Sequence, residues 1–286
     1  MVKQPQYVFI GGLGGSGTRI VARITQKLGF YLGPVLNEPL DNLLFSFLFK
    51  RPDWFVNLPD DAAFARALDS FLTETQHGQP GRIAGLKKPE FRAMMQAIRK
   101  WPGPAGARRN HVRAMIDHAA PDLSRYTGIA CKEPNTHVFL PQLACHLPDM
   151  RFVLVMRNGL DMALSRNRQQ LDNWGAALGI EQKPDEPAHK AQLRFWAMAN
   201  RRCIDAGQTL LGERFHVLRY DDLCTDPAPQ SAALAAFLGC RLPKSLHDRI
   251  PAELAPSSRG RYRDAAAGTF DDADHDLVRR FGFDVQ

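Results

Sequence analysis

The segment that most constrains the fold lies near the N-terminus, where an apolar run ends in a glycine-rich loop. It reads YVFIGGLGGSGTRIVARITQKLG over residues 7–29. A short apolar run bounded by glycine is typical of a buried strand, and the apolar residues at 20, 21, 24 and 28 predict a helix over residues 16–28. A strand, glycine loop and helix can bind a phosphate, because loop N–H groups and the positive end of the helix dipole face the anion.

The loop matches two common nucleotide-binding patterns only in part. Gly12 and Gly17 have the spacing of GxxxxGK[ST], but Thr18 and Arg19 stand where Lys and Ser/Thr are needed. Residues 12–17 satisfy GxGxxG, but no acidic residue follows a second strand at the distance that ribose binding requires. ATP hydrolysis is therefore poorly supported, and a P-loop-type kinase with a degenerate loop is kept as an alternative.

The rest of the chain alternates short apolar runs with helical periodicity. We expect strands at residues 7–12, 128–131, 151–156 and 215–220, with 82–86 as a further candidate. We expect helices at residues 16–28, 136–147, 159–171, 189–209 and 228–238. This alternation predicts an α/β fold with a P-loop-like parallel sheet flanked by helices, and residues 41–118 as a helical insertion. In such sheets, ligands bind at the carboxyl ends of the strands.

A second candidate anion site follows the strand expected at residues 151–156. Arg157 comes directly after this strand, and Ser165 lies eight residues later, two turns into the expected helix. A guanidinium fork and a hydroxyl donor on the same side suit a phosphate. Two candidate anion sites at one sheet edge are less likely to arise by chance than one alone.

These motifs resemble the sulfotransferases that use 3′-phosphoadenosine 5′-phosphosulfate. Ser16-Gly17-Thr18 matches the motif that holds the 5′-phosphosulfate, and Arg157 with Ser165 matches the motif that holds the 3′-phosphate. The segments CKEP and LRYDDLCTDP also look like bacterial members, and the resemblance covers roughly residues 7–50 and 128–265. It implies one sulfotransferase-like domain over residues 1–286, and a sulfuryl transfer that requires no metal. The donor-binding residues implied in the loop are Gly14, Gly15, Ser16, Gly17, Thr18 and Arg19.

The resemblance also implies the catalytic groups. Most relatives carry Lys or Arg just before Ser-Gly-Thr, where this chain has Gly15, so Arg19 is expected to compensate in part. Glu38 is the expected base, with Asp41 as its rival, and Lys132 is the expected cation near the leaving oxygen. Residues 87 and 88, both lysines, are alternatives to Lys132.

A basic segment near the C-terminus completes the implied donor site. Related enzymes close a late basic loop over the 3′-phosphate, which makes Arg259, Gly260 and Arg261 candidates. A homologue that binds the donor without transferring the sulfuryl group is a further alternative. The acceptor stays open among small molecules, glycans and lipid headgroups, as does the oligomeric state.

The composition of the chain narrows the classes of ligand and the cellular compartment that we expect. The formal net charge of +7 favours an anionic ligand, but the basic residues are scattered among acids, so a nucleic-acid-binding module ranks last. The five cysteines are far apart and form no CxxC pair, which argues against a disulfide framework or zinc site. We expect a cytoplasmic protein, because we find neither a signal peptide nor an apolar run long enough to span a membrane.

Overall fold

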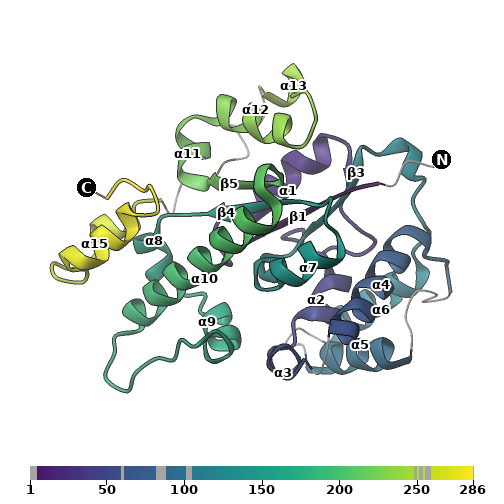
Figure 1. The fold of residues 1–286 in the computed structure, drawn as a ribbon, viewed down its shortest axis with the longest axis horizontal. Helices are drawn as coiled ribbons and strands as arrows, with labels where there is room; N and C mark the ends of the chain where they lie inside the picture. The colour runs from purple at the N-terminus through teal and green to yellow at the C-terminus, as the bar shows by residue number, and fades with distance from the viewer. Residues whose placement is uncertain are drawn as a thin grey trace.

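A parallel five-stranded sheet forms the centre of the protein in the computed structural model (Figure 1). The structure describes residues 5–58, 61–81, 88–100, 105–247, 250, 254 and 259–285. The strands are β1 (Gln6–Gly12), β2 (Phe30–Tyr31), β3 (Gly128–Lys132), β4 (Arg151–Met156) and β5 (Phe215–Arg219). They lie in the order β2-β3-β1-β4-β5, and every neighbouring pair is parallel. The predicted parallel α/β sheet is therefore confirmed.

Helices connect the strands and surround the sheet. The α-helices are α1 (Thr18–Lys27), α2 (Leu43–Phe49), α3 (Pro52–Val56), α4 (Asp61–His77), α5 (Lys88–Lys100), α6 (Ala105–Asp117), α7 (Leu140–His146), α8 (Gly159–Ala163), α9 (Gln169–Trp174), α10 (Ala188–Leu211), α11 (Tyr220–Thr225), α12 (Pro227–Phe237), α13 (Lys244–His247) and α15 (Asp272–Arg279). The 3₁₀ helices are η1 (Leu123–Arg125), η2 (Pro134–Phe139), η3 (Ala176–Leu178), η4 (Gly212–Arg214) and η6 (Arg261–Asp264). Within the described ranges, no helix combines the length and the apolarity needed to cross a bilayer.

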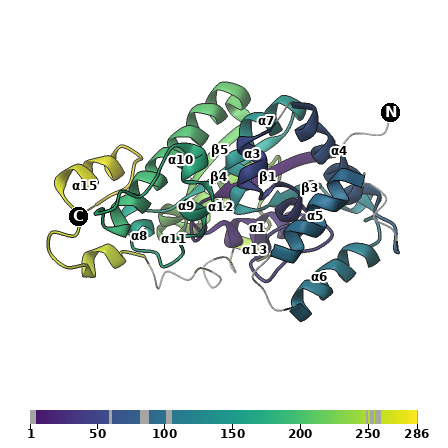
Figure 2. The same ribbon diagram turned by 90° about the horizontal axis from the view of Figure 1, so that it is seen from below.

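Helices cover both faces of the sheet. Because successive side chains of a strand point to opposite faces, each strand contributes to two hydrophobic clusters. Val8 and Ile10 of β1 pack in one hydrophobic cluster with α1 and α12, whereas Phe9 packs in the other with α7 and α10. In Figure 2, α7 and α10 lie on one side of the strands and α1 and α13 on the other. The sheet is thus a middle layer, and its strand ends are left to build a site.

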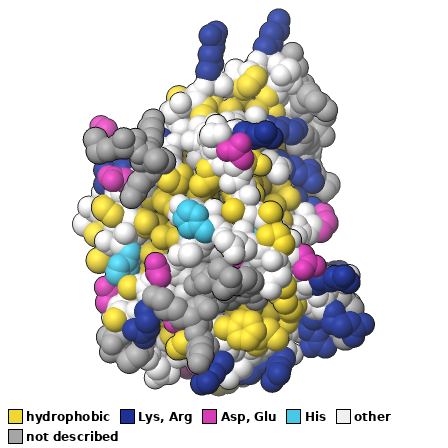
Figure 3. Space-filling model, turned by 90° about the vertical axis from the view of Figure 1, so that its right-hand side faces the viewer, with side chains coloured by type: hydrophobic (Ala, Val, Ile, Leu, Met, Phe, Trp, Pro, Cys, Tyr) yellow, Lys and Arg dark blue, Asp and Glu magenta, His cyan; other side chains and the backbone are white. Residues whose placement is uncertain are grey.

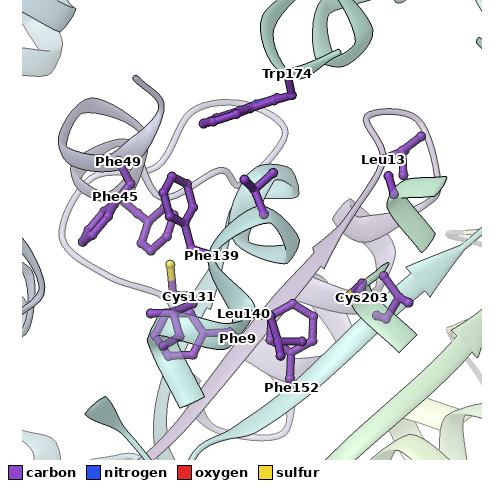
Figure 4. Close-up of a cluster of buried hydrophobic side chains, with 14 of the residues drawn as sticks. Phe9, Leu13, Phe45, Phe49, Cys131, Phe139, Leu140, Phe152, Trp174 and Cys203 are labelled. Carbon is purple, nitrogen blue, oxygen red and sulfur yellow. The ribbon is translucent and has the colours of Figure 1, made fainter. Parts of the chain in front are cut away.

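The predicted helical insertion lies between β2 and β3 and consists of α2 to α6. Its inner side is aromatic: Phe45 stacks on Phe49 with ring centroids 4.4 Å apart (Figure 4). Phe49 meets Phe139 of η2 edge-on at 5.8 Å, and Phe55 meets Trp174 of α9 edge-on at 5.7 Å. Figure 3 shows the side of the molecule that carries this region, where hydrophobic side chains gather between groups of Lys and Arg. Aromatic packing therefore attaches the insertion to η2 and α9 beside the sheet.

Three expected elements differ from those observed. The helix expected at residues 136–147 is the 3₁₀ helix η2 followed by the short helix α7, where Pro141 has no N–H to continue the helix. The helix expected at residues 159–171 is two short helices, α8 and α9, because side chains between them take over backbone hydrogen bonds: Ser165 Oγ accepts from Asn167 N at 3.2 Å, and Asn167 Oδ1 accepts from Gln169 N at 3.1 Å. The strand expected to end at Tyr220 ends one residue earlier, and Tyr220 opens α11. The candidate strand at 82–86 lies outside the described residues.

Candidate functional site

The glycine loop joins β1 to α1 at the carboxyl edge of the sheet. Gly15 and Gly17 have φ angles of 96° and 97°, in the left-handed region that other residues rarely adopt. At Gly17 a Cβ atom would lie 2.2 Å from the Tyr220 ring, so the loop passes too close to α11 for any side chain there. Among the described residues, Ser16 Oγ is buried without a hydrogen-bond partner. The loop therefore has the form of a phosphate cradle, with a hydroxyl available to a ligand.

A glutamine that the sequence did not single out holds this loop. Gln170 of α9 is buried, and its Oε1 accepts a hydrogen bond from Gly14 N at 2.9 Å. Its Nε2 donates to Asn135 Oδ1 at 3.0 Å, and the same oxygen accepts from Trp174 Nε1 at 2.8 Å. No local pattern could have identified Gln170, because its partner lies 156 residues away in the chain. Gln170 links the loop rigidly to η2 and α9.

Arg157 reaches the loop from the end of β4. Its side chain is buried, with Nη1 3.5 Å from the Gly15 carbonyl oxygen and its guanidinium carbon 5.8 Å from the centre of the Tyr220 ring. The two candidate anion-binding motifs of the sequence thus lie in contact. Ser165, the expected partner of Arg157, is half-buried in the linker between α8 and α9, so its predicted place two turns into a helix is wrong.

Asp161 ties the C-terminal basic loop to this site. Its side chain is fully buried and accepts hydrogen bonds from Gly260 N at 2.7 Å and Tyr262 N at 3.2 Å. Its Oδ2 also lies 3.5 Å from Arg157 Nη2. One carboxylate therefore fixes both the loop that contains Gly260 and the arginine beside the glycine loop.

The flanking arginines are held separately. Arg259 donates to Thr225 Oγ1 at 2.6 Å and lies 3.8 Å from an oxygen of Asp221, whose pKa is raised by burial. Burial lowers the pKa of Arg261, the third residue of the predicted basic loop.

A cavity of about 770 Å³ borders this loop. Besides Asp161, four of its lining residues are aspartates. Because this lining is acidic, the cavity itself does not favour an anion.

The candidate catalytic groups meet in the strap, which we define as residues 33–42. Glu38 lies on its outer side, where its carboxylate oxygens are 3.0 and 3.3 Å from the guanidinium nitrogens of Arg19. Asp41 forms an ion pair with Lys132, which is 2 % exposed and also donates to the Pro39 carbonyl oxygen at 3.0 Å. Each of the two carboxylates proposed as base is thus paired with one of the two proposed cations.

The helix after the strap is capped by another residue. Asn42 Oδ1 accepts a hydrogen bond from Phe45 N at 3.0 Å, so Glu38 is not the cap of α2. Residue 87, one alternative to Lys132, lies outside the described residues, and residue 88 opens α5 without a described side chain.

A group of possible metal ligands lies elsewhere. In the part of the chain that the structure describes, ligand atoms of Asp61, Cys145 and His146 lie within 4.8 Å of one another. The sequence could not reveal this group, because the fold brings the start of α4 to the end of α7. None of its members belongs to the strand-end site.

Taken together, the fold and the site define an α/β protein with a glycine loop after β1 that has the form of a phosphate cradle, and a buried arginine after the adjacent β4. The family model described as "Sulfotransferase family" matches residues 5–244. The chain therefore belongs to the sulfotransferase family, as its motifs predicted.

Solved structures agree with this fold. The sulfotransferase domain from the curacin biosynthetic pathway has a TM-score of 0.52 and 13% identity, with 99% of this chain and 100% of that chain covered. The sulfotransferase domain from the Synechococcus PCC 7002 olefin synthase has a TM-score of 0.51 and 15% identity, covering 99% of this chain and 97% of that chain. A comparison with curated proteins gave no match.

Proposed function

We propose that this sulfotransferase takes its sulfuryl group from 3′-phosphoadenosine 5′-phosphosulfate and transfers it to a hydroxyl or amine of a small acceptor. The observation that carries the proposal is the contact between the glycine loop and Arg157, with Nη1 3.5 Å from the Gly15 carbonyl oxygen. A donor with anions at both its 5′ and 3′ positions needs two adjacent anion sites of this kind. The free thiols of the five cysteines are compatible with action in the cytoplasm.

The residues present fit such a donor. The 5′-phosphosulfate would lie on the loop, where the Ser16 hydroxyl and the N-terminus of α1 offer donors. The 3′-phosphate would bind Arg157, with Ser165 and the Arg259–Gly260 loop beside it. Asp161 would keep this second site in place, since it already binds Gly260 N and Arg157.

In the transfer, the acceptor oxygen would form a bond to sulfur while the bond from sulfur to the bridging oxygen breaks. The electron pair would leave with the bisphosphate, and the acceptor proton would pass to Glu38 or Asp41. Arg19 and Lys132 would stabilise charge on the leaving oxygen and the sulfonate. As in phosphoryl transfer, most of the catalysis would come from positioning and charge stabilisation.

Calorimetry with adenosine 3′,5′-bisphosphate, the product nucleotide, tests the proposal. We expect binding by the wild type, and about 10- to 100-fold weaker binding by Arg157→Ala, because charge-assisted hydrogen bonds contribute about 1.5–3 kcal/mol. Arg151→Ala is the matched control, since Arg151 begins the same strand at its other end. Tight binding of Mg-ATP with none of the bisphosphate would favour a kinase-like protein. Bisphosphate binding without transfer to any acceptor would favour a non-catalytic homologue.

A further inference from the structure

A cavity of about 650 Å³ lies on the acceptor side of the site, between the strap and helices α2, α3, α5 and α9. Asp41 lines this cavity, so it begins at the carboxylate that pairs with Lys132. Gln169 also lines it and directly precedes Gln170, the residue that holds the glycine loop. The volume is in the range of small-ligand pockets. Because a candidate base lines this cavity, it is a candidate place for the acceptor.

The acidic side chains of this cavity already have partners inside the protein to different degrees. Asp41 is already paired with Lys132. Glu133 accepts hydrogen bonds from Asn135 N at 2.6 Å, Asn135 Nδ2 at 2.8 Å and Ser46 Oγ at 3.3 Å, and burial raises its pKa. The charge of Lys50 acts on Glu133 in the opposite direction and lowers its pKa. Asp41 and Glu133 thus already have partners inside the protein, and Asp53 is the remaining acidic residue of the lining.

Three cations line the same cavity. Lys50 donates to the neutral amide of Gln169 at 2.9 Å, and no ion pair among the described residues includes Lys50 or Lys100. The guanidinium carbon of Arg51 lies 4.2 Å from the centre of the Trp54 ring, and burial lowers the pKa of Arg51 to about 10, so it stays charged at neutral pH. The Nε atom of Arg51 donates to the Leu48 carbonyl oxygen at 2.7 Å, and this bond holds the guanidinium group in one orientation.

We propose that the acceptor is an acidic hydroxyl compound, whose carboxylate or sulfate binds Arg51, Lys50 and Lys100 while its hydroxyl faces Asp41. A planar guanidinium held by a tryptophan ring suits a carboxylate or sulfate, because it presents two parallel N–H donors. The cavity thus offers cations to a negative charge of the acceptor and a carboxylate to its reacting hydroxyl. This inference rests on the sulfotransferase function proposed above.

The test uses the full-length enzyme, ³⁵S-labelled 3′-phosphoadenosine 5′-phosphosulfate and matched pairs of hydroxyl compounds. Each pair contains a free acid and its neutral amide, built on phenol, sugar and aliphatic alcohol frames. We expect label in acids, with kcat/KM at least tenfold above that of the matching amide. Label in the amides at equal or higher kcat/KM, or in no member of any pair although the bisphosphate binds, overturns the inference. If the wild type does not bind the bisphosphate, the proposed donor use has failed, which is a distinguishable result.

A single substitution distinguishes recognition of the acceptor's negative charge from a general loss of enzyme function. Lys50→Met should raise KM for the preferred acid about tenfold with little change in kcat, and leave the parameters for the matching amide unchanged. Arg92→Met is the control. Arg92 is an exposed residue of α5 outside the cavity lining, and its substitution removes the same formal charge as Lys50→Met. Equal KM changes for acid and amide in Lys50→Met would contradict recognition of an anion.

Discussion

Replacing Glu38 by glutamine separates a role in chemistry from a role in structure. Glu38 and Arg19 form a bidentate pair whose side chains are 77% and 42% exposed. Exposed pairs contribute about 0–1 kcal/mol, so Glu38→Gln should change the free energy of unfolding by less than about 1 kcal/mol. The affinity for adenosine 3′,5′-bisphosphate should also stay close to that of the wild type, because no proton transfer is involved in binding.

Turnover should respond quite differently. A general base contributes about 10²–10⁴-fold, which corresponds to about 3–5 kcal/mol in the activation free energy. We therefore expect Glu38→Gln to lose sulfuryl transfer by this factor when transfer is measured with labelled donor and saturating acceptor. Urea unfolding and calorimetry on the same preparation show whether fold and nucleotide binding are intact.

Asp41→Asn is the matched comparison, since Asp41 is the rival base. Its pair with Lys132 is buried, and removal of one partner of such a pair costs about 3–5 kcal/mol. Asp41→Asn should thus lose stability as well as activity. Wild-type turnover in Glu38→Gln would refute the assignment of Glu38 as base, and loss of turnover in a folded Asp41→Asn would then move that role to Asp41.

Three further variants test how the site is held. Asp161→Asn should weaken bisphosphate binding in calorimetry and cost about 3–5 kcal/mol in urea unfolding, because Arg157 loses its buried counter-charge. Gln170→Leu should cost about 1–3 kcal/mol in the same unfolding experiment, since Gly14 N loses its acceptor. Burial, followed by the charge of Arg202, lowers the pKa of His137 to about 3, below its unfolded value of 6.5. Its contribution to stability is therefore complete above pH 6.5 and falls by about 2 kcal/mol as the pH drops to about 5, a slope that His137→Gln should remove in pH-dependent unfolding.

The elements that carry strong local patterns could be predicted from the sequence. β1, β3 and β4 are short apolar runs bounded by turns, and they lie within one residue of their predicted bounds. The glycine loop and Arg157 follow from position alone, because strand ends of a parallel sheet meet at one edge. β2 has only two residues, too few for any periodicity to appear.

The supports of the site could not be predicted in the same way. Gln170 and Asp161 act through hydrogen bonds to backbone N–H groups 156 and 99 residues away, at Gly14 and Gly260. Such bonds depend on how helices pack and leave no spacing in the chain. The break after α8 is different, since it depends on local bonds from backbone N–H groups to Ser165 and Asn167, side chains that can compete with the helix for these groups.

Gly15 is where the chain departs from most sulfotransferases that it resembles, and the loop geometry accounts for the difference. Its φ angle of 96° disfavours any residue with a Cβ, at a cost of about 1–2 kcal/mol. Arg157 Nη1 lies 3.5 Å from the Gly15 carbonyl oxygen, so positive charge reaches the same part of the loop from β4. Arg19 and Lys132 are held in place by acidic partners in the strap. In the transfer proposed above, Arg19 and Lys132 would replace the single basic side chain. Because both are already fixed by the fold, little reorganisation would be needed when charge develops on the leaving oxygen.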